Sequence, residues 1–144
     1  MTEKKMMSGM EYLNQIQEAK ARVRKLCDKI RNLEAMATDD AYHLTGPIGH
    51  GQTDRDKTGT LIAKKCDAER ELEEAEKAAE EILDEVGMVI TQIDNQNAQN
   101  VIRMRYVDGM KYEDIAAEMM FSVPRIYQIR RTGIKEVESI IRSG

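Results

Sequence analysis

Apolar and small residues recur in this chain at alternating intervals of four and three. The first stripe consists of Tyr12, Ile16, Ala19, Val23, Leu26, Ile30, Leu33 and Ala37, and the second of Ala68, Leu72, Ala75, Ala79, Ile82, Val86, Val89 and Ile93. A seven-residue repeat keeps one stripe of a helix facing a partner helix. The pattern predicts two long helices, neither of which can bury its stripe alone.

The segment between the two stripes is predicted to be a connector. Residues 38–60 contain Gly46, Pro47, Gly49, Gly51 and Gly59, and glycine and proline at this density interrupt a helical pattern. A chain that returns across such a connector brings the two stripes together, so residues 1–94 are predicted to form a long antiparallel coiled-coil helical hairpin. Because several stripe positions are alanine, the core of the hairpin is thin, and we expect a homodimer formed through it.

A different pattern begins after the polar segment 94-DNQNAQN-100, whose asparagines can cap a helix. We therefore assign residues 95–144 to a second domain. Its first predicted helix runs from Val101 to Asp108 and ends there because Gly109 suits the left-handed conformation that stops a helix.

The rest of this domain matches a helix-turn-helix without gaps. Tyr112 to Met119 is predicted to be its first helix, and Ser122 is the expected N-cap of the next helix. Met120 stands where such turns usually have glycine, so either Met120 has a positive φ or the turn differs. The positions expected to hold the two helices together are Ile115, Ala116, Met119, Phe121, Ile126 and Ile129. The predicted fold is all-α: a helical hairpin followed by a helix-turn-helix unit.

Charge separates the two domains. The chain has 22 Lys and Arg against 26 Asp and Glu, a formal net charge of −4. Residues 61–95 carry four basic and eleven acidic side chains, a net of −7, whereas residues 96–144 carry eight basic and six acidic, a net of +2. The stretch from Phe121 to Lys135 contains four basic residues and no acidic residue. This local excess of positive charge in an acidic chain points to an anionic partner.

Double-stranded DNA is the partner that this pattern predicts. In a helix-turn-helix the second helix enters the major groove, where early residues meet base edges and flanking basic residues contact phosphates. Gln128 and Arg131 can make bidentate contacts to adenine or guanine, and Arg125 and Tyr127 are expected to position the helix. The predicted DNA-binding residues are Ser122, Val123, Arg125, Tyr127, Gln128, Arg130, Arg131 and Lys135.

Residues 101–141 resemble region 4 of sigma-70-type factors, in the motifs RMRY-DG, EDIA and S--RIYQI. With the hairpin, the acidic second helix and the connector TGPIGHGQTDRDKTG, the whole chain resembles phage-encoded sigma-like proteins of the ArpU type. The resemblance implies a transcription regulator from a phage or prophage that controls late phage genes. It also implies a possible partner in bacterial RNA polymerase, a location in the cytoplasm of the bacterial host cell, and base reading by Gln128.

Two other functions stay open. A small terminase subunit for DNA packaging also combines a helix-turn-helix with coiled segments, and it forms a ring of many subunits. A helical oligomer that binds only protein would use the same helices without touching DNA.

Catalysis, cofactors, metals and membranes are not expected. Cys27 and Cys66 lack the paired spacing of metal sites, and His43 and His50 have no partner ligand at such a spacing. The sequence contains no nucleophile with a base and an acid and no phosphate-binding glycine motif. No apolar run approaches the ~18 residues that cross a bilayer, and the polar N-terminus lacks a secretory signal.

Overall fold

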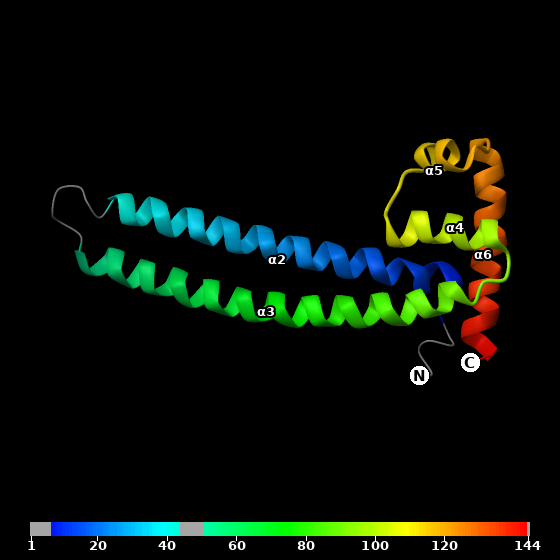
Figure 1. Ribbon diagram of the computed structural model, residues 1–144. Coiled ribbons are helices and arrows are strands. Elements are labelled where there is room, and N and C mark those ends of the chain that lie inside the picture. Colours follow the sequence, from blue (N-terminus) through cyan, green and yellow to red (C-terminus); the bar gives the residue numbers. More distant parts are fainter. Residues whose placement is uncertain (1–6, 44–50, 144) are drawn as a thin grey trace. The chain divides into compact units, whose positions relative to one another are not determined.

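The computed structural model describes residues 7–43 and 51–143, and within these residues it is all-helical, as the sequence predicts (Figure 1). The elements are α2 (Gly9–His43), α3 (Gly51–Thr91), α4 (Gln96–Ile102), the π-helical turn η1 (Arg103–Val107), α5 (Tyr112–Met119) and α6 (Val123–Ser143). None of the helices in the described part is long and apolar enough to cross a membrane.

The two long helices extend into the predicted connector. Helix α2 continues to His43 and α3 begins at Gly51, so the assignment of the whole of residues 38–60 to a connector is wrong. Gly59 lies inside α3, with no atom within 4 Å of the place where a Cβ would stand. A glycine inside a helix costs only about 1 kcal/mol, which a helix of 41 residues absorbs. Gly46, Pro47 and Gly49 lie outside the described residues.

The chain divides into two compact units. We call Met1–Ala19 with Ala79–Gly144 the core unit, and Lys20–Ala78 the hairpin unit. The boundary predicted after residue 94 therefore falls inside the core unit. The reason is the apolar stripe, because the start of α2 and the end of α3 share one buried cluster with α4, α5 and α6. From the long helices and the exit of α3 this cluster takes Tyr12, Leu13, Ile16, Val86, Val89, Ile90 and Ile93.

The C-terminal helices of the core unit pack closely. Ile102, Ile115 and Ile126 are fully buried, and Ala116 is buried at one of the positions expected to hold the two helices together. Helix α6 approaches α4 at Gly133, where an added Cβ would lie 2.5 Å from Cγ1 of Ile102. Only glycine permits this approach without a shift of the buried isoleucine.

The turns between these helices follow local sequence signals. Asn95 caps α4, accepting a hydrogen bond from the N–H of Ala98 at 3.1 Å, so this helix begins earlier than the predicted Val101. Gly109 has a φ of 71°, the left-handed conformation expected of it. Met120 also adopts this conformation, with a φ of 59°, and its side chain is 90% exposed. Of the two conformations that the sequence left open for Met120, the structure has the positive φ.

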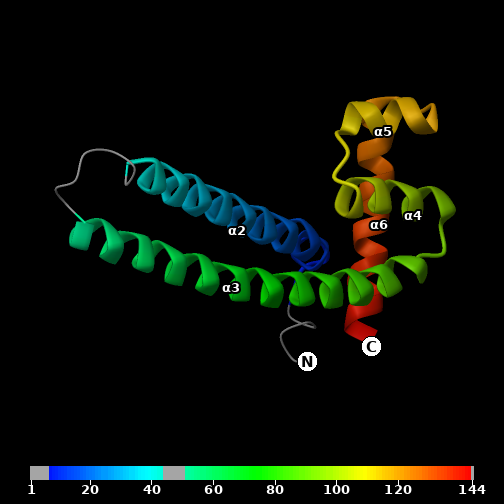
Figure 2. The same ribbon diagram turned by 60° about the vertical axis from the view of Figure 1, so that its left-hand side comes forward.

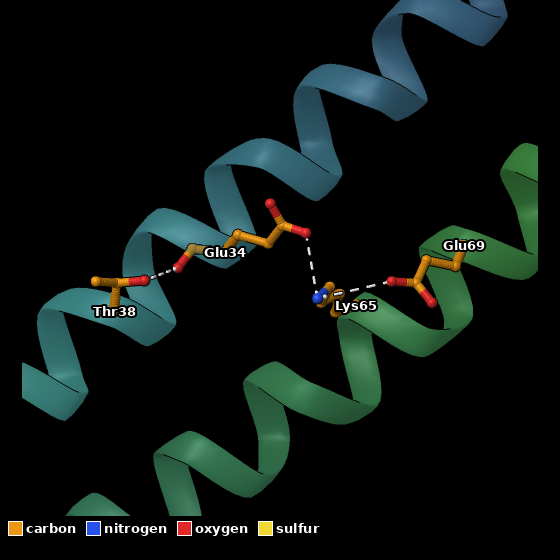
Figure 3. Close-up of polar contacts among 4 residues, drawn as sticks. All are labelled: Glu34, Thr38, Lys65 and Glu69. Carbon is orange, nitrogen blue, oxygen red and sulfur yellow. Dashed lines mark hydrogen bonds and ion pairs between the residues drawn. The ribbon is translucent and has the colours of Figure 1, made fainter.

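Within the hairpin unit, α2 and α3 run side by side in opposite directions (Figures 1 and 2). Among its described side chains, the buried apolar ones are Leu26, Leu33, Ala68 and Ala75. Lys65 Nζ lies 3.2 Å from Glu34 Oε1 across the two helices and 3.8 Å from Glu69 Oε1 (Figure 3). The hydrogen bond with Glu34, followed by the charge of that carboxylate, raises the pKa of Lys65. These side chains are 37% to 52% exposed, so solvent screens the pairing and it adds little to stability.

Candidate nucleic-acid interface

Helix α6 has one buried side and one exposed side. Its buried residues are Ile126, Ile129, Gly133, Val137 and Ile141, spaced three and four apart. The helix starts where the Oγ of Ser122 accepts a hydrogen bond from the N–H of Arg125 at 3.3 Å, which confirms the predicted cap. Pro124 follows within the first turn, where its missing N–H costs nothing. The opposite side of α6 is therefore left to solvent.

The exposed side carries a row of cationic and amide side chains. We call Arg125, Gln128, Arg131, Lys135 and Arg142 the basic stripe, and all five are exposed. Gln128, Lys135 and Arg142 are seven residues apart, so they lie on one side of the helix. The two acidic residues of α6, Glu136 and Glu138, are half-buried. Glu138 Oε1 accepts a hydrogen bond from the N–H of Gly9 at 3.0 Å, so this carboxylate is engaged inside the core unit.

Two members of the stripe contact each other. Arg125 Nη1 donates a hydrogen bond to Gln128 Oε1 at 3.2 Å. This contact holds the amide near the middle of the stripe and leaves its NH2 group directed to other acceptors. The side chains of Arg131 and Lys135 have no hydrogen bond or ion pair to the described residues. Their charges are available to an anion from outside the chain.

Three other predicted residues make contacts within the core unit. Arg130 is half-buried, and its Nε donates a hydrogen bond to the Tyr106 hydroxyl at 3.0 Å. The Tyr127 ring lies 4.5 Å from the Tyr112 ring, tilted by 35°. Val123 is half-buried against the apolar cluster. The structure thus brings Arg125, Gln128, Arg131 and Lys135 together on one surface but gives Arg130, Tyr127 and Val123 internal partners.

Sequence reasoning missed two cationic residues of the core unit. Arg142 belongs to the basic stripe, and its distance of seven residues from Lys135 could have revealed it. Arg105 was also missed, and its guanidinium lies 4.2 Å from the centre of the Tyr112 ring. No sequence signal marks this contact, because it depends on the π-helical turn η1 that carries Arg105.

Together, the fold and this surface define an all-helical protein with a basic face on its last helix. The chain belongs to the family described as protein of unknown function DUF1492, whose model matches residues 44–138. The matched segment contains α3, α4, η1, α5 and the part of α6 that bears most of the basic stripe. No curated protein and no solved structure matches the chain.

Proposed function

We propose that this protein is a sequence-specific double-stranded DNA-binding transcription regulator of phage or prophage origin, which acts on or with host RNA polymerase. The basic stripe of α6 is the observation that carries this proposal. In the proposed complex with DNA, α5 and α6 act as a helix-turn-helix, and α6 is the helix that enters the major groove. The tight connection through Met120 and the cap at Ser122 support this arrangement.

Each part of the stripe has a chemical role in this proposal. Gln128 lies between cationic residues and reads adenine through its amide, which can donate and accept in the same plane. Arg125 orients that amide through their hydrogen bond. Arg131 reads guanine or contacts a phosphate, and Lys135 and Arg142 neutralise phosphates farther along the helix. In this arrangement Gln128 reads the bases near the start of the stripe, and the phosphate backbone is contacted towards its C-terminal end.

Charge elsewhere in the chain favours DNA contact through α6. Residues 61–95 of the long second helix and its exit carry a net charge of −7, which repels the phosphate backbone. A duplex is therefore attracted to α6 and repelled by α3. We further propose that α2 and α3 form a coiled-coil hairpin that joins two copies, because a dimer reads two half-sites with two equivalent helices.

A mobility-shift titration tests this function. Duplexes from the regions around the protein's own gene are titrated at two salt concentrations with the wild type and with the triple variant Arg125→Ala, Gln128→Ala, Arg131→Ala. The control is Arg22→Ala, Arg24→Ala, Asn32→Ala, which removes the same charge from exposed positions on α2. We expect the stripe variant to lose about a hundredfold or more in affinity for a selected duplex, and the control to bind like the wild type.

The salt dependence sharpens the result. A phosphate contact by Arg131 predicts that the stripe variant lowers the slope of log K against log salt concentration by about 1. Equal behaviour of the wild type and the stripe variant on every duplex would overturn the proposal and favour a protein-only role. Sedimentation of the same samples reports assembly, and a ring of many subunits would favour DNA packaging over regulation.

A further inference from the structure

A second polar site lies in the core unit, on a part of α6 that the basic stripe does not include. A cleft of about 400 Å³ is lined by Asn14 and Gln17 of α2, Arg105 and Tyr106 of η1, Tyr112 of α5 and Arg130 of α6. Asp and Glu are absent from its lining. We propose that this cleft binds the phosphate group of a ligand.

The two guanidinium groups of the cleft have no acidic partner among the described residues. Arg105 lies 4.2 Å and Arg130 5.7 Å from the centre of the same Tyr112 ring. The negative face of the ring offsets part of the repulsion between them, but an aromatic ring does not neutralise charge. In a chain with a net charge of −4, two guanidinium groups that share one ring and have no carboxylate partner form a binding site for an anion from outside the chain.

Hydrogen bonds hold both guanidinium groups in place before any ligand binds. Arg105 Nη1 donates to the carbonyl of Met110 at 2.9 Å, and Arg130 Nε donates to the Tyr106 hydroxyl at 3.0 Å. A guanidinium has five N–H donors, so most remain available on each planar fork. Groups fixed in this way lose less entropy when they bind a ligand.

The rim of the cleft is fixed by Gln17. Its Nε2 donates to the carbonyls of Tyr106 and Val107 at 3.0 and 3.3 Å, which ties η1 to α2 within the core unit. Gly109 follows with a positive φ, and a Cβ there would lie 3.4 Å from Gln17 Oε1. The side-chain amide of Asn14 has no hydrogen bond among the described residues and supplies a neutral donor to the cleft.

This set of donors fits phosphate better than carboxylate. One guanidinium fork satisfies the two oxygens of a carboxylate, whereas two forks with an amide match the three oxygens and higher charge of a phosphate group. The volume of the cleft also leaves room for a group attached to the phosphate. Small phosphorylated compounds and a nucleic-acid backbone both present this chemistry.

The cleft and the basic stripe lie on different sides of α6. Arg130 is two residues from Gln128, which is a rotation of about 200° around the helix. A duplex that contacts Gln128 is therefore not expected to cover the cleft, and we infer that a free ligand is its source of phosphate. This inference does not depend on DNA binding by the stripe.

Calorimetric titration of the full chain with inorganic pyrophosphate at constant ionic strength tests the cleft. The main variant is Asn14→Asp, which places a carboxylate in the cleft without removing a hydrogen bond made by the described residues. The control is Asn32→Asp, the same change at an exposed position of α2 in the hairpin unit. We expect saturable binding by the wild type and by Asn32→Asp, and binding weaker by about tenfold or more in Asn14→Asp.

Arg105→Gln provides a second variant, with Arg103→Gln, an exposed neighbour in η1, as its control. Circular dichroism establishes that each variant is folded. Absence of saturable binding by the wild type, or equal affinity of Asn14→Asp and the wild type, overturns the proposal.

Titrations with the stripe variant and with duplex-saturated protein separate the two proposals. The stripe variant is expected to bind pyrophosphate like the wild type even where it no longer binds DNA. Loss of DNA binding alone would thus leave the cleft proposal intact. Loss of pyrophosphate binding alone would likewise leave the DNA-binding proposal intact. Pyrophosphate binding to duplex-saturated protein supports a free ligand, whereas displacement by the duplex assigns the phosphate to the nucleic-acid backbone and overturns the free-ligand source.

Discussion

The core unit and the hairpin unit bury their apolar stripes to different degrees although the same two helices run through both. In the core unit Leu13 is fully buried and belongs to a cluster to which α2, α3, α4, α5 and α6 all contribute side chains. In the hairpin unit Leu33 retains 8% exposure, and the buried side chains that α3 contributes to this unit are the alanines Ala68 and Ala75. Two helices can cover only a narrow stripe of each other, whereas additional helices close a core on several sides.

This difference teaches where the stability of the chain resides. A repeated apolar pattern gives a helix its stripe, but the depth of burial depends on how many neighbours surround that stripe. We expect most of the free energy of unfolding to come from the core unit. The hairpin unit then depends on its length, on weak ion pairs such as Lys65 with Glu34, and on a second copy if the proposed dimer forms.

The largest expected effect compares one substitution in the two units. Leu13→Ala in the core unit is expected to lower the free energy of unfolding by about 3–5 kcal/mol, because a closed core cannot collapse around the cavity. Leu33→Ala, on the same helix but in the hairpin unit, is expected to cost about 2 kcal/mol or less. Urea unfolding monitored by circular dichroism measures both. Equal losses would contradict the comparison and indicate that another copy covers the hairpin stripe.

Alkaline pH is expected to weaken the core unit through Tyr12. Burial, and then the nearby charge of Glu85, raises the pKa of Tyr12 to about 12, whereas an unfolded tyrosine ionises near pH 10. The stabilising contribution is therefore complete below pH 10 and is lost as pH rises towards 12, a loss of about 2 kcal/mol. Urea unfolding between pH 9 and 12 measures this loss.

Tyr12→Phe is expected to lose less stability over that pH range than the wild type. The matched variant is Tyr127→Phe, which changes an exposed tyrosine of α6 and should keep the full loss. A Tyr12→Phe protein with the same pH dependence as the wild type would show that another group governs alkaline unfolding.

The smallest effects come from one glycine in each unit, and they have opposite signs. Gly133→Ala brings a Cβ to 2.5 Å from Cγ1 of buried Ile102. The forced shift is expected to outweigh the gain in helix propensity, for a net loss of about 1–2 kcal/mol. Gly59→Ala meets nothing within 4 Å and is expected to gain up to about 1 kcal/mol. Thermal unfolding of the two variants measures both, and a stabilising Gly133→Ala would mean that α4 and α6 separate easily.

Short-range chemistry explains which features the sequence predicted well. The bounds of α5, the left-handed Gly109 and the cap by Ser122 each depend on a few neighbouring residues. The exposed positions of Gln128, Arg131 and Lys135 follow from the 3.6-residue period of a single helix. The ends of α2 and α3 were predicted less well, because the glycines at 51 and 59 were taken as breaks and a long helix tolerates them.

The amino-acid sequence by itself determined that the chain is helical, where its short helices stop, and which side of α6 carries positive charge. These features arise within one helix or one turn. Tertiary structure alone decided that the start of α2 and the end of α3 share a core with α4 to α6. It also decided that Arg130 and Tyr127 face internal partners and that Arg105, Arg130 and Asn14 line one cleft. The cleft brings together residues as far apart as Asn14 and Arg130, and this depends on how the helices pack, which no local pattern records.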